Sequence, residues 1–189
     1  HETMSKLAEK PRYTLPNLHH TAYHADKLAK LAPKLSNPMM QILADKLLRN
    51  YGGLRPIDSS KEQLIHGDPQ LNNVLFKGTD PLTFIDLDTV MVGSIWLDIG
   101  DLIRSITEDY LSGNIIKEIY PRIKQLLHGY YDSASLSISF DSFLRQSLNA
   151  SRHIAIELSM RFLNDCVENT YFKWDEEFYS TKLDYLHDR

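Results

Sequence analysis

The sequence lacks the features that mark several large classes of protein. Its 189 residues contain one cysteine, Cys166, so no internal disulfide can form, and a reducing compartment such as the cytoplasm is expected. No apolar run approaches the roughly 20 residues that a membrane-spanning helix needs. Lysine and arginine are scattered, and the formal net charge is −4, so neither nucleic acid nor an anionic membrane is an expected partner.

Glycine is also sparse. The glycines are isolated apart from Gly52-Gly53, and no Gly-x-Gly-x-x-Gly pattern occurs. What the chain does have is apolar material, because 42% of its residues are hydrophobic and 10% are aromatic. That is enough for one ordinary domain, or for one large lobe of a two-lobed enzyme, to bury a core.

Helical spacing of apolar residues dominates both ends of the chain, and short apolar runs dominate the middle. Gln63–Ile65, Asn73–Phe76 and Leu82–Ile85 have strand character, and the turn-forming segment 77–81 predicts that the last two form a hairpin. The fold class is therefore α+β and mostly α-helical, with the short strands lying on helices. The expected helices are Ala22–Leu35, Met39–Tyr51, Trp96–Ile106, Ile115–Tyr131, Phe140–Val167 and Glu177–His187.

A polar loop, His66–Asn73, joins the first two expected strands. Asp68 and Asn73 are five residues apart, a spacing that can bring a carboxylate and an amide oxygen into one site. Asp86 and Asp88 end the second strand of the hairpin and point to the same side if the strand runs that far. Oxygen ligands of this kind suit Mg²⁺.

Phosphoryl transfer needs such a set of groups. One carboxylate, Asp68, would orient or deprotonate the attacking hydroxyl, while Asn73 and Asp86 would hold Mg²⁺ against nucleotide phosphates. Taken singly, each residue also fits a plain turn, a solvated strand end or a helix cap. Their order along strand, loop, strand, turn and strand favours the catalytic interpretation.

This arrangement resembles the aminoglycoside phosphotransferase and choline kinase superfamily, whose members share the protein-kinase-like fold. Those proteins carry a His-Gly-Asp-x-x-x-x-Asn loop, then an apolar strand ending in Ile-Asp, as do His66–Asn73 and Ile85-Asp86. Asp98–Arg104, Arg161–Asp165 and Tyr171–Lys173 are similar in more detail to N-acetylhexosamine 1-kinases, which phosphorylate the anomeric hydroxyl of an amino sugar. The resemblance implies a kinase for a small-molecule hydroxyl, with ATP as phosphoryl donor and Mg²⁺ as cofactor.

The resemblance also implies roles for individual residues of the polar loop. Asp68 matches the catalytic base, and Asn73 and Asp86 match the Mg²⁺ ligands. Gln70 stands where these kinases commonly have lysine or histidine, and a neutral amide stabilises charge on the transferred phosphoryl group less well. His66 would be structural, with its imidazole packed under the loop.

Residues further along the chain match supporting and substrate-binding positions. Asp98 matches an aspartate that braces the catalytic loop, and an ordinary helix N-cap is compatible with that role. Asp88, Arg161 and Tyr171 are candidates for the sugar pocket. The alternative for Arg161 is an ion pair with Glu157 on one helix face, and for Tyr171 it is packing in the core or at its rim.

A kinase of this type also needs a tight loop over the phosphates and a strand lysine paired with a helix glutamate, and neither pattern is present. We therefore expect residues 1–14 to be a lead-in and residues 15–189 to be the C-terminal lobe, inactive without its N-terminal nucleotide lobe. Apolar surface bared at the cleft would favour self-association. The alternatives are a non-catalytic remnant that binds a sugar or a protein, and an aminoglycoside or choline kinase.

Overall fold

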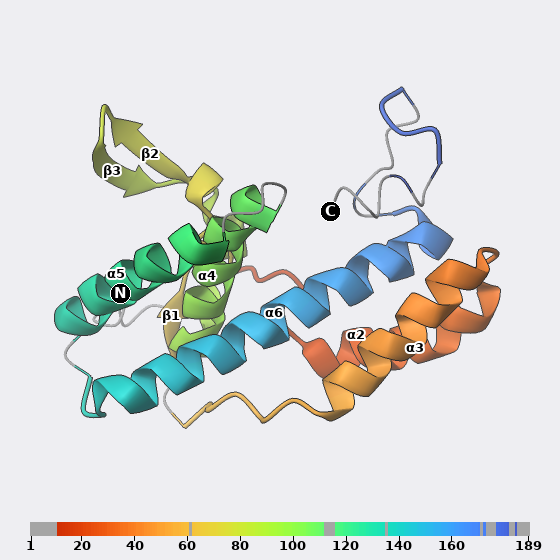
Figure 1. Ribbon diagram of the computed structural model, residues 1–189, viewed down its shortest axis with the longest axis horizontal. Coiled ribbons are helices and arrows are strands. Elements are labelled where there is room, and N and C mark those ends of the chain that lie inside the picture. Colours follow the sequence, from red (N-terminus) through yellow and green to blue (C-terminus); the bar gives the residue numbers. More distant parts are fainter. Residues whose placement is uncertain are drawn as a thin grey trace. The chain divides into compact units, whose positions relative to one another are not determined.

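The computed structural model describes residues 11–60, 62–111, 116–134, 136–170, 172, 177–181 and 184, which form helices and small antiparallel sheets (Figure 1). This confirms the α+β class. The helices are α2 (Thr21–Leu31), α3 (Pro38–Gly52), α4 (Ile95–Leu111), α5 (Ile116–Ser133) and α6 (Phe140–Glu168). Each was expected from the sequence to within a few residues, apart from the longer C-terminal end of α4. Within the described residues, no helix combines the length and apolar character needed to cross a membrane.

Helix α3 shows how local sequence sets these boundaries. The side chain of Asn37 caps the helix by accepting a 2.8 Å hydrogen bond from the N–H of Met39. Pro38 occupies the first helical position, where its missing N–H costs nothing. Met40 and Ala44 then follow at helical spacing on the buried face.

The four strands of the described chain form two separate sheets. β1 (Glu62–Ile65) pairs antiparallel with β4 (Met91–Ser94), and β2 (Val74–Lys77) pairs antiparallel with β3 (Asp80–Phe84). The β2–β3 hairpin confirms the sequence prediction. The sequence did not predict β4, whose pairing partner lies about thirty residues earlier in the chain.

The chain divides into two compact units. The first comprises His1–His19 and Arg55–Ile154, and the second comprises His20–Leu54 and Ala155–Arg189, so α6 contributes to both. Each unit has its own hydrophobic core. The first core contains Trp96, Ile99, Ile103, Leu127, Phe143 and Ala150, and the second contains Ala25, Leu28, Leu35, Met40, Ala44, Leu47, Met160 and Leu163.

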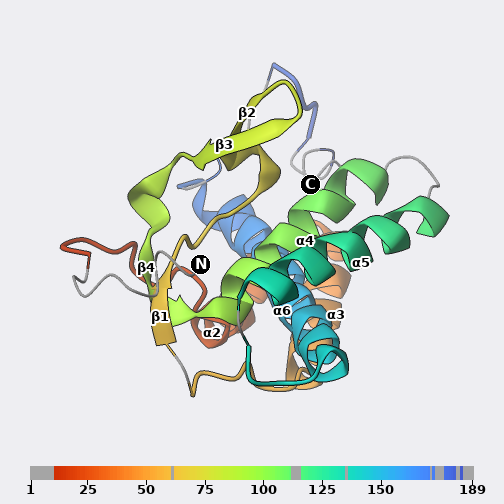
Figure 2. The ribbon, with the colours of Figure 1, turned by 90° about the vertical axis from the view of Figure 1, so that its left-hand side faces the viewer.

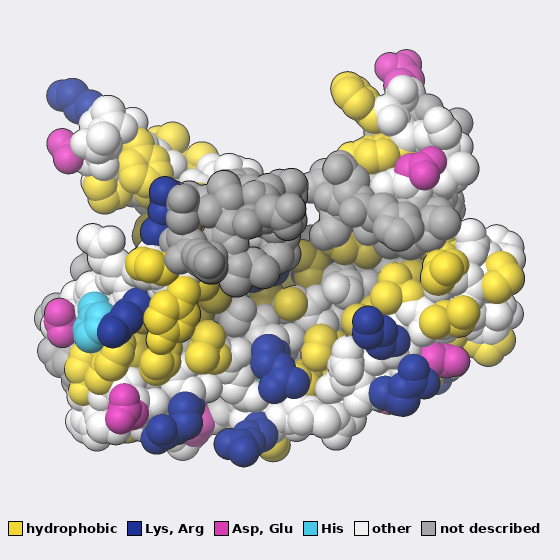
Figure 3. Space-filling view, viewed as in Figure 1, with side chains coloured by type: hydrophobic (Ala, Val, Ile, Leu, Met, Phe, Trp, Pro, Cys, Tyr) yellow, Lys and Arg dark blue, Asp and Glu magenta, His cyan; other side chains and the backbone are white. Residues whose placement is uncertain are grey.

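The two sheets differ in burial. β1 and β4 lie on α4, and Ile65 of β1 is fully buried, as expected for short strands. The β2–β3 hairpin instead stands away from α4 and α5 (Figures 1 and 2), and every residue of β3 is exposed, so the expectation that all strands lie on helices is wrong. Hydrophobic side chains are visible on this hairpin, together with charged and other side chains (Figure 3). The exposed large hydrophobic residues on and beside it are Leu71, Leu75, Phe76, Leu82, Phe84, Ile85 and Leu87.

The end of the chain departs from the expected pattern. Residues 177–181 form turns and bends, so the helix expected over Glu177–His187 is wrong at its start, and most of its remainder lies outside the described residues. The segment after α6 is instead tied to the helix by Asp165. Its carboxylate accepts hydrogen bonds from the N–H groups of Thr170 at 2.8 Å and Phe172 at 3.0 Å.

Candidate active site

The polar loop, His66–Asn73, connects β1 of one sheet to β2 of the other. Its first two N–H groups, those of His66 and Gly67, each donate a 2.8 Å hydrogen bond to the carboxylate of Asp98. Asp98 is 2% exposed and lies in the first turn of α4, which begins at Ile95, so it is not an N-cap. Burial raises the pKa of Asp98, and the two backbone hydrogen bonds partly oppose that rise. A buried carboxylate thus fixes the start of the loop.

The imidazole of His66 lies buried beneath the loop. Its Nε2 donates to the carbonyl of Ile85 at 3.0 Å, and its Nδ1 accepts from the N–H of Asp68 at 3.3 Å, which assigns the neutral Nε2–H tautomer. The ring also packs against Phe84, with 5.1 Å between ring centroids. His66 therefore links the loop to the end of β3.

Gly67 adopts a conformation that other residues rarely adopt. Its φ is +83°, and a Cβ atom there would lie 2.3 Å from the carbonyl oxygen of Thr89. Thr89 is itself held close, because its hydroxyl donates a 2.8 Å hydrogen bond to the carbonyl of His66. The turn that presents Asp68 therefore requires glycine.

Two side chains without a predicted role also hold the loop. His19 donates from Nε2 to the carbonyl of Gly67 at 2.5 Å, and Ser105 accepts a 2.9 Å hydrogen bond at Oγ from the N–H of Leu71. The contact of His19 could not be predicted, because it joins residues 48 positions apart.

One face of α4 runs along the polar loop. Asp98, Asp101 and Ser105 follow the i, i+3, i+7 spacing of a single helix face, with Asp98 holding the start of the loop and Ser105 its far end. This spacing is visible in the sequence and could have indicated Asp101 and Ser105. Of these three residues, only Asp98 was predicted from the sequence to have a role.

Three predicted site residues meet within the polar loop. Oδ2 of Asp68 accepts hydrogen bonds of 3.2 Å from Nε2 of Gln70 and from Nδ2 of Asn73. The same Asn73 nitrogen donates to the backbone carbonyl of Asp68 at 2.9 Å. Asn73 is 7% exposed, so its amide is a fixed part of the loop.

Asp101 lies within hydrogen-bonding reach of Asp68. It is 4% exposed, and its Oδ1 pairs with Nε of Arg104 at 2.8 Å. Its Oδ2 is buried and receives no hydrogen bond from any described donor, so the contact with Asp68 becomes a hydrogen bond only when one carboxyl is protonated.

Burial, and then the neighbouring Asp101 carboxyl, raise the pKa of Asp68 to about 6, against the opposing effects of Arg104 and Asn73. At neutral pH the Asp68 carboxyl is therefore mostly ionised. Its pKa nevertheless stays close to neutrality, as suits a group that must accept a proton during a reaction.

Asp86 lies two residues after the end of β3 and close to the end of the polar loop. The N–H of Ile85 donates to the carbonyl of Asn73 at 2.9 Å, and Asp86 has a left-handed φ of 59° with an exposed side chain. In the described structure neither the Asp86 carboxylate nor the Asn73 amide oxygen accepts a hydrogen bond.

Oxygen donors of these two kinds suit Mg²⁺, which usually binds one or two protein oxygens and completes its shell with phosphate and water. Among the described residues there is no group of three or more His, Cys, Asp or Glu side chains that could hold a metal. A dedicated all-protein cage of the kind that binds structural metals is thus not present in that part of the chain.

The predicted substrate residues belong to different parts of the chain. β3 ends at Phe84, and Asp88 lies exposed in a 3₁₀ turn, so the strand does not run as far as Asp86 and Asp88 and does not place them on one side. Arg161 belongs to the second unit, where its guanidinium lies 5.5 Å from the centroid of the Phe172 ring. Tyr171 lies outside the described residues.

Comparison with known proteins supports the resemblance at the level of the family. The model of the phosphotransferase enzyme family matches residues 2–129, a span that includes the polar loop, Asp86 and the whole of α4. No curated protein and no solved structure matches the chain. Members of the matching family are phosphotransferases. Because the match covers more than half of the sequence, this chain belongs to the phosphotransferase enzyme family.

Proposed function

We propose that the protein is an ATP- and Mg²⁺-dependent kinase that phosphorylates a hydroxyl group of a small molecule, namely an amino sugar or another sugar. The observation that carries the proposal is the state of Asp68. Its carboxylate is held by Gln70 and Asn73, and its pKa lies at about 6. A carboxylate with this pKa in a rigid loop is suited to accept a hydroxyl proton near neutral pH.

Each residue of the polar loop has a distinct task in this proposal. Asp68 orients the acceptor hydroxyl and takes its proton as the oxygen attacks phosphorus. Gln70 and Asn73 hold the carboxylate in place, since both donate to Oδ2. Asp98 and Ser105 fix the two ends of the backbone that carries it, so that little reorganisation is needed during the reaction.

The Asn73 amide oxygen and the Asp86 carboxylate would hold the metal, and bound Mg²⁺·ATP would supply the phosphoryl group and neutralise charge on it. Asp86 is suited to this task because its side chain is exposed and unpaired in the described structure. The left-handed backbone at Asp86 is the kind of strain that accumulates at functional sites.

The acceptor is assigned from the pattern of the more distant residues. The sequence segments after Asp98 and around Arg161 are similar to those of amino-sugar 1-kinases. We therefore propose Asp88, Arg161 and Tyr171 as contacts for the sugar. An aminoglycoside or choline acceptor is equally consistent with the family match, so the choice rests on these residues alone.

The exposed hairpin supports a second part of the proposal. Kinases clamp ATP with a separate nucleotide-binding lobe. The hairpin begins beside Asn73, ends close to Asp86 and exposes several large hydrophobic residues. We propose that such a lobe covers this surface, that residues 15–189 form the catalytic lobe, and that this lobe has little activity by itself.

The acceptor can be tested with a panel of hydroxyl compounds. The chain, alone and joined to the segment encoded immediately upstream of His1, would be incubated with Mg²⁺·ATP and N-acetylglucosamine, N-acetylgalactosamine, choline or kanamycin. We expect transfer to an N-acetylhexosamine, and only by the joined protein. Transfer only to choline or kanamycin would overturn the sugar assignment. Full activity of the chain alone would overturn the need for a second lobe. Light scattering of the chain alone would show whether it self-associates, as expected if another copy covers the hairpin in place of that lobe.

A further inference from the structure

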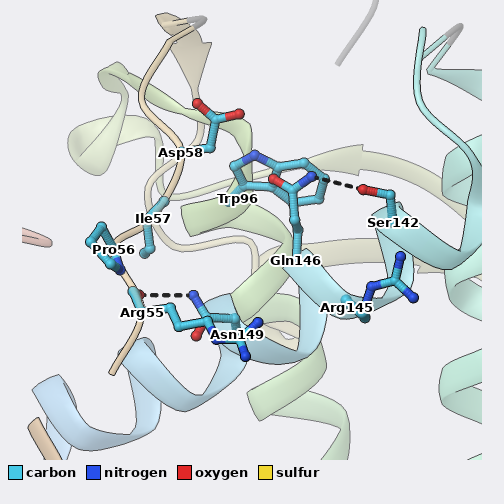
Figure 4. Close-up of a pocket in the computed structure, with 9 residues that line it drawn as sticks. All are labelled: Arg55, Pro56, Ile57, Asp58, Trp96, Ser142, Arg145, Gln146 and Asn149. Atoms are coloured by element: carbon cyan, nitrogen blue, oxygen red, sulfur yellow. Dashed lines mark hydrogen bonds between the residues drawn. The ribbon is translucent and has the colours of Figure 1, made fainter. Parts of the chain in front are cut away.

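A pocket of about 210 Å³ lies on the first unit, away from the polar loop (Figure 4). It is formed by the segment Arg55–Asp58, by Trp96 near the start of α4, and by the first turns of α6. The segment precedes β1 and the polar loop follows β1, so this strand, about 13 Å long, lies between them along the chain. No lining residue belongs to the proposed active site.

The wall of the pocket is fixed by hydrogen bonds to its backbone. The carbonyl of Arg55 accepts from Nδ2 of Asn149 at 3.0 Å and from Nε2 of His153 at 2.6 Å. At the other end of the segment, the hydroxyl of Ser94 donates to the carbonyl of Asp58 at 2.6 Å. The segment is therefore held before any ligand arrives, and the carbonyls at its two ends are already paired.

The groups that remain available in the pocket are mostly hydrogen-bond donors. Arg55 and Arg145 are exposed, and neither side chain takes part in an ion pair or hydrogen bond in the described structure. The indole N–H of Trp96 also donates no hydrogen bond within the described residues. The acid among the lining residues is Asp58, which accepts a hydrogen bond from the N–H of Ser60. Two guanidinium groups against one carboxylate give the pocket a positive balance in a protein of net charge −4.

We propose that this pocket binds a small metabolite through a phosphate or carboxylate group. The guanidinium groups of Arg55 and Arg145 supply paired N–H donors, which match the geometry of such oxyanions better than an ammonium group does. Trp96 and Ile57 offer an apolar wall for the rest of the ligand. The volume suits a ligand smaller than a typical drug molecule.

Intrinsic fluorescence tests the proposal, because Trp96 is one of two tryptophans in the chain. Inorganic phosphate and acetate would be titrated separately, with sodium chloride of equal ionic strength as the reference. We expect a saturable change with a Kd on the order of 1 mM for at least one of the two anions, and the stronger response identifies the preferred group. A Trp96→Phe variant should lose the optical change.

Matched arginine variants locate the binding. Arg145→Gln and, separately, Arg55→Gln should each raise the Kd at least about fivefold, since each loses a charged donor. Arg152→Gln, which removes an exposed arginine of α6 outside the pocket, should leave the Kd unchanged. Circular dichroism checks that each variant is folded. Because the two pocket variants are tested separately, one still tests the proposal if the other does not fold. An unsaturable response, an equal response to chloride, or equal weakening by Arg152→Gln would overturn the proposal.

Discussion

The carboxyl group of Asp101 lies against that of Asp68, with Arg104 paired to the opposite side of Asp101. Burial raises the pKa of Asp68 most, and the contact raises it further, because two carboxyls so close cannot both ionise freely. We predict that Asp101→Asn lowers this pKa from about 6 towards its ordinary value of 3.8. Carbon-13 NMR titration of the aspartate carboxyls, with chelator present, measures it. Asp141→Asn, at an exposed aspartate of α6, is the control. An unchanged pKa in Asp101→Asn would contradict the assigned contact.

The raised pKa of Asp68 also makes stability depend on pH. Between about 3.8 and about 6, the folded chain binds more protons at this site than the unfolded chain, so the free energy of unfolding falls as the pH rises. Because Asp68 is only half-buried, we expect about 1 kcal/mol from this group. Urea unfolding of the wild type and of Asp68→Asn at about pH 4 and about pH 7 tests it. The free energy of unfolding of the wild type, relative to that of the variant, should fall as the pH rises. A difference between the two free energies that does not change with pH would refute the prediction.

Asp98 satisfies two buried N–H groups at once, those of His66 and Gly67. Asp98→Ala leaves both without an acceptor, and we expect a loss of about 2–4 kcal/mol in the free energy of unfolding. Denaturant unfolding provides the measurement. Asp45→Ala, at an exposed position of α3, should change stability by less than about 0.5 kcal/mol. Comparable effects of the two variants would show that Asp98 does not brace the loop.

Gly67 and Gly78 both have positive φ, of +83° and +63°, but only Gly67 is crowded. We predict that Gly78→Ala costs about 1–2 kcal/mol, the strain of a left-handed residue alone. Gly67→Ala should cost more by at least about 2 kcal/mol, because its Cβ would clash with the Thr89 carbonyl. Thermal or urea unfolding of the two variants separates the strain from the clash. Equal costs would mean that the turn at Gly67 can relax away from Thr89.

Ser105 is predicted to position the polar loop through its contact with the N–H of Leu71. Ser105→Ala should speed amide hydrogen exchange at Leu71 and lower kcat about tenfold with little change in KM. Ser105→Thr keeps the hydroxyl and should restore both. If neither hydrogen exchange nor kcat responds to the loss of the hydroxyl, Ser105 has no positioning role.

Local patterns allowed much of the fold to be predicted. The helices follow from their apolar spacing, and the hairpin follows from the turn-forming residues between β2 and β3. β4 was missed because Met91–Ser94 becomes a strand only by pairing with β1, which is a contact between distant segments. The exposure of the hairpin was missed because a strand rich in apolar residues is normally predicted to be buried, and its burial depends on contacts with distant segments.

The candidate site likewise contains local contacts that the sequence predicts and long-range contacts that it does not. Asp68, Gln70 and Asn73 lie within one short loop, so their spacing was enough to group them. Asp101 and His19 act on that loop from other elements, and only the folded chain shows their contacts. The sugar contact of Arg161 remains a prediction, because the sequence alone does not fix where the side chain of a single helical residue points.

The central claim is that Asp68 is the base of a phosphoryl transfer reaction. Its most direct test is phosphorus-31 NMR of Mg²⁺·ATP with the preferred acceptor, using the chain joined to its upstream segment and the same protein carrying Asp68→Asn. The account predicts that kcat falls at least about 100-fold in Asp68→Asn, while the melting temperature near neutral pH changes little and Asp141→Asn retains full activity. Wild-type turnover by a folded Asp68→Asn protein would contradict it.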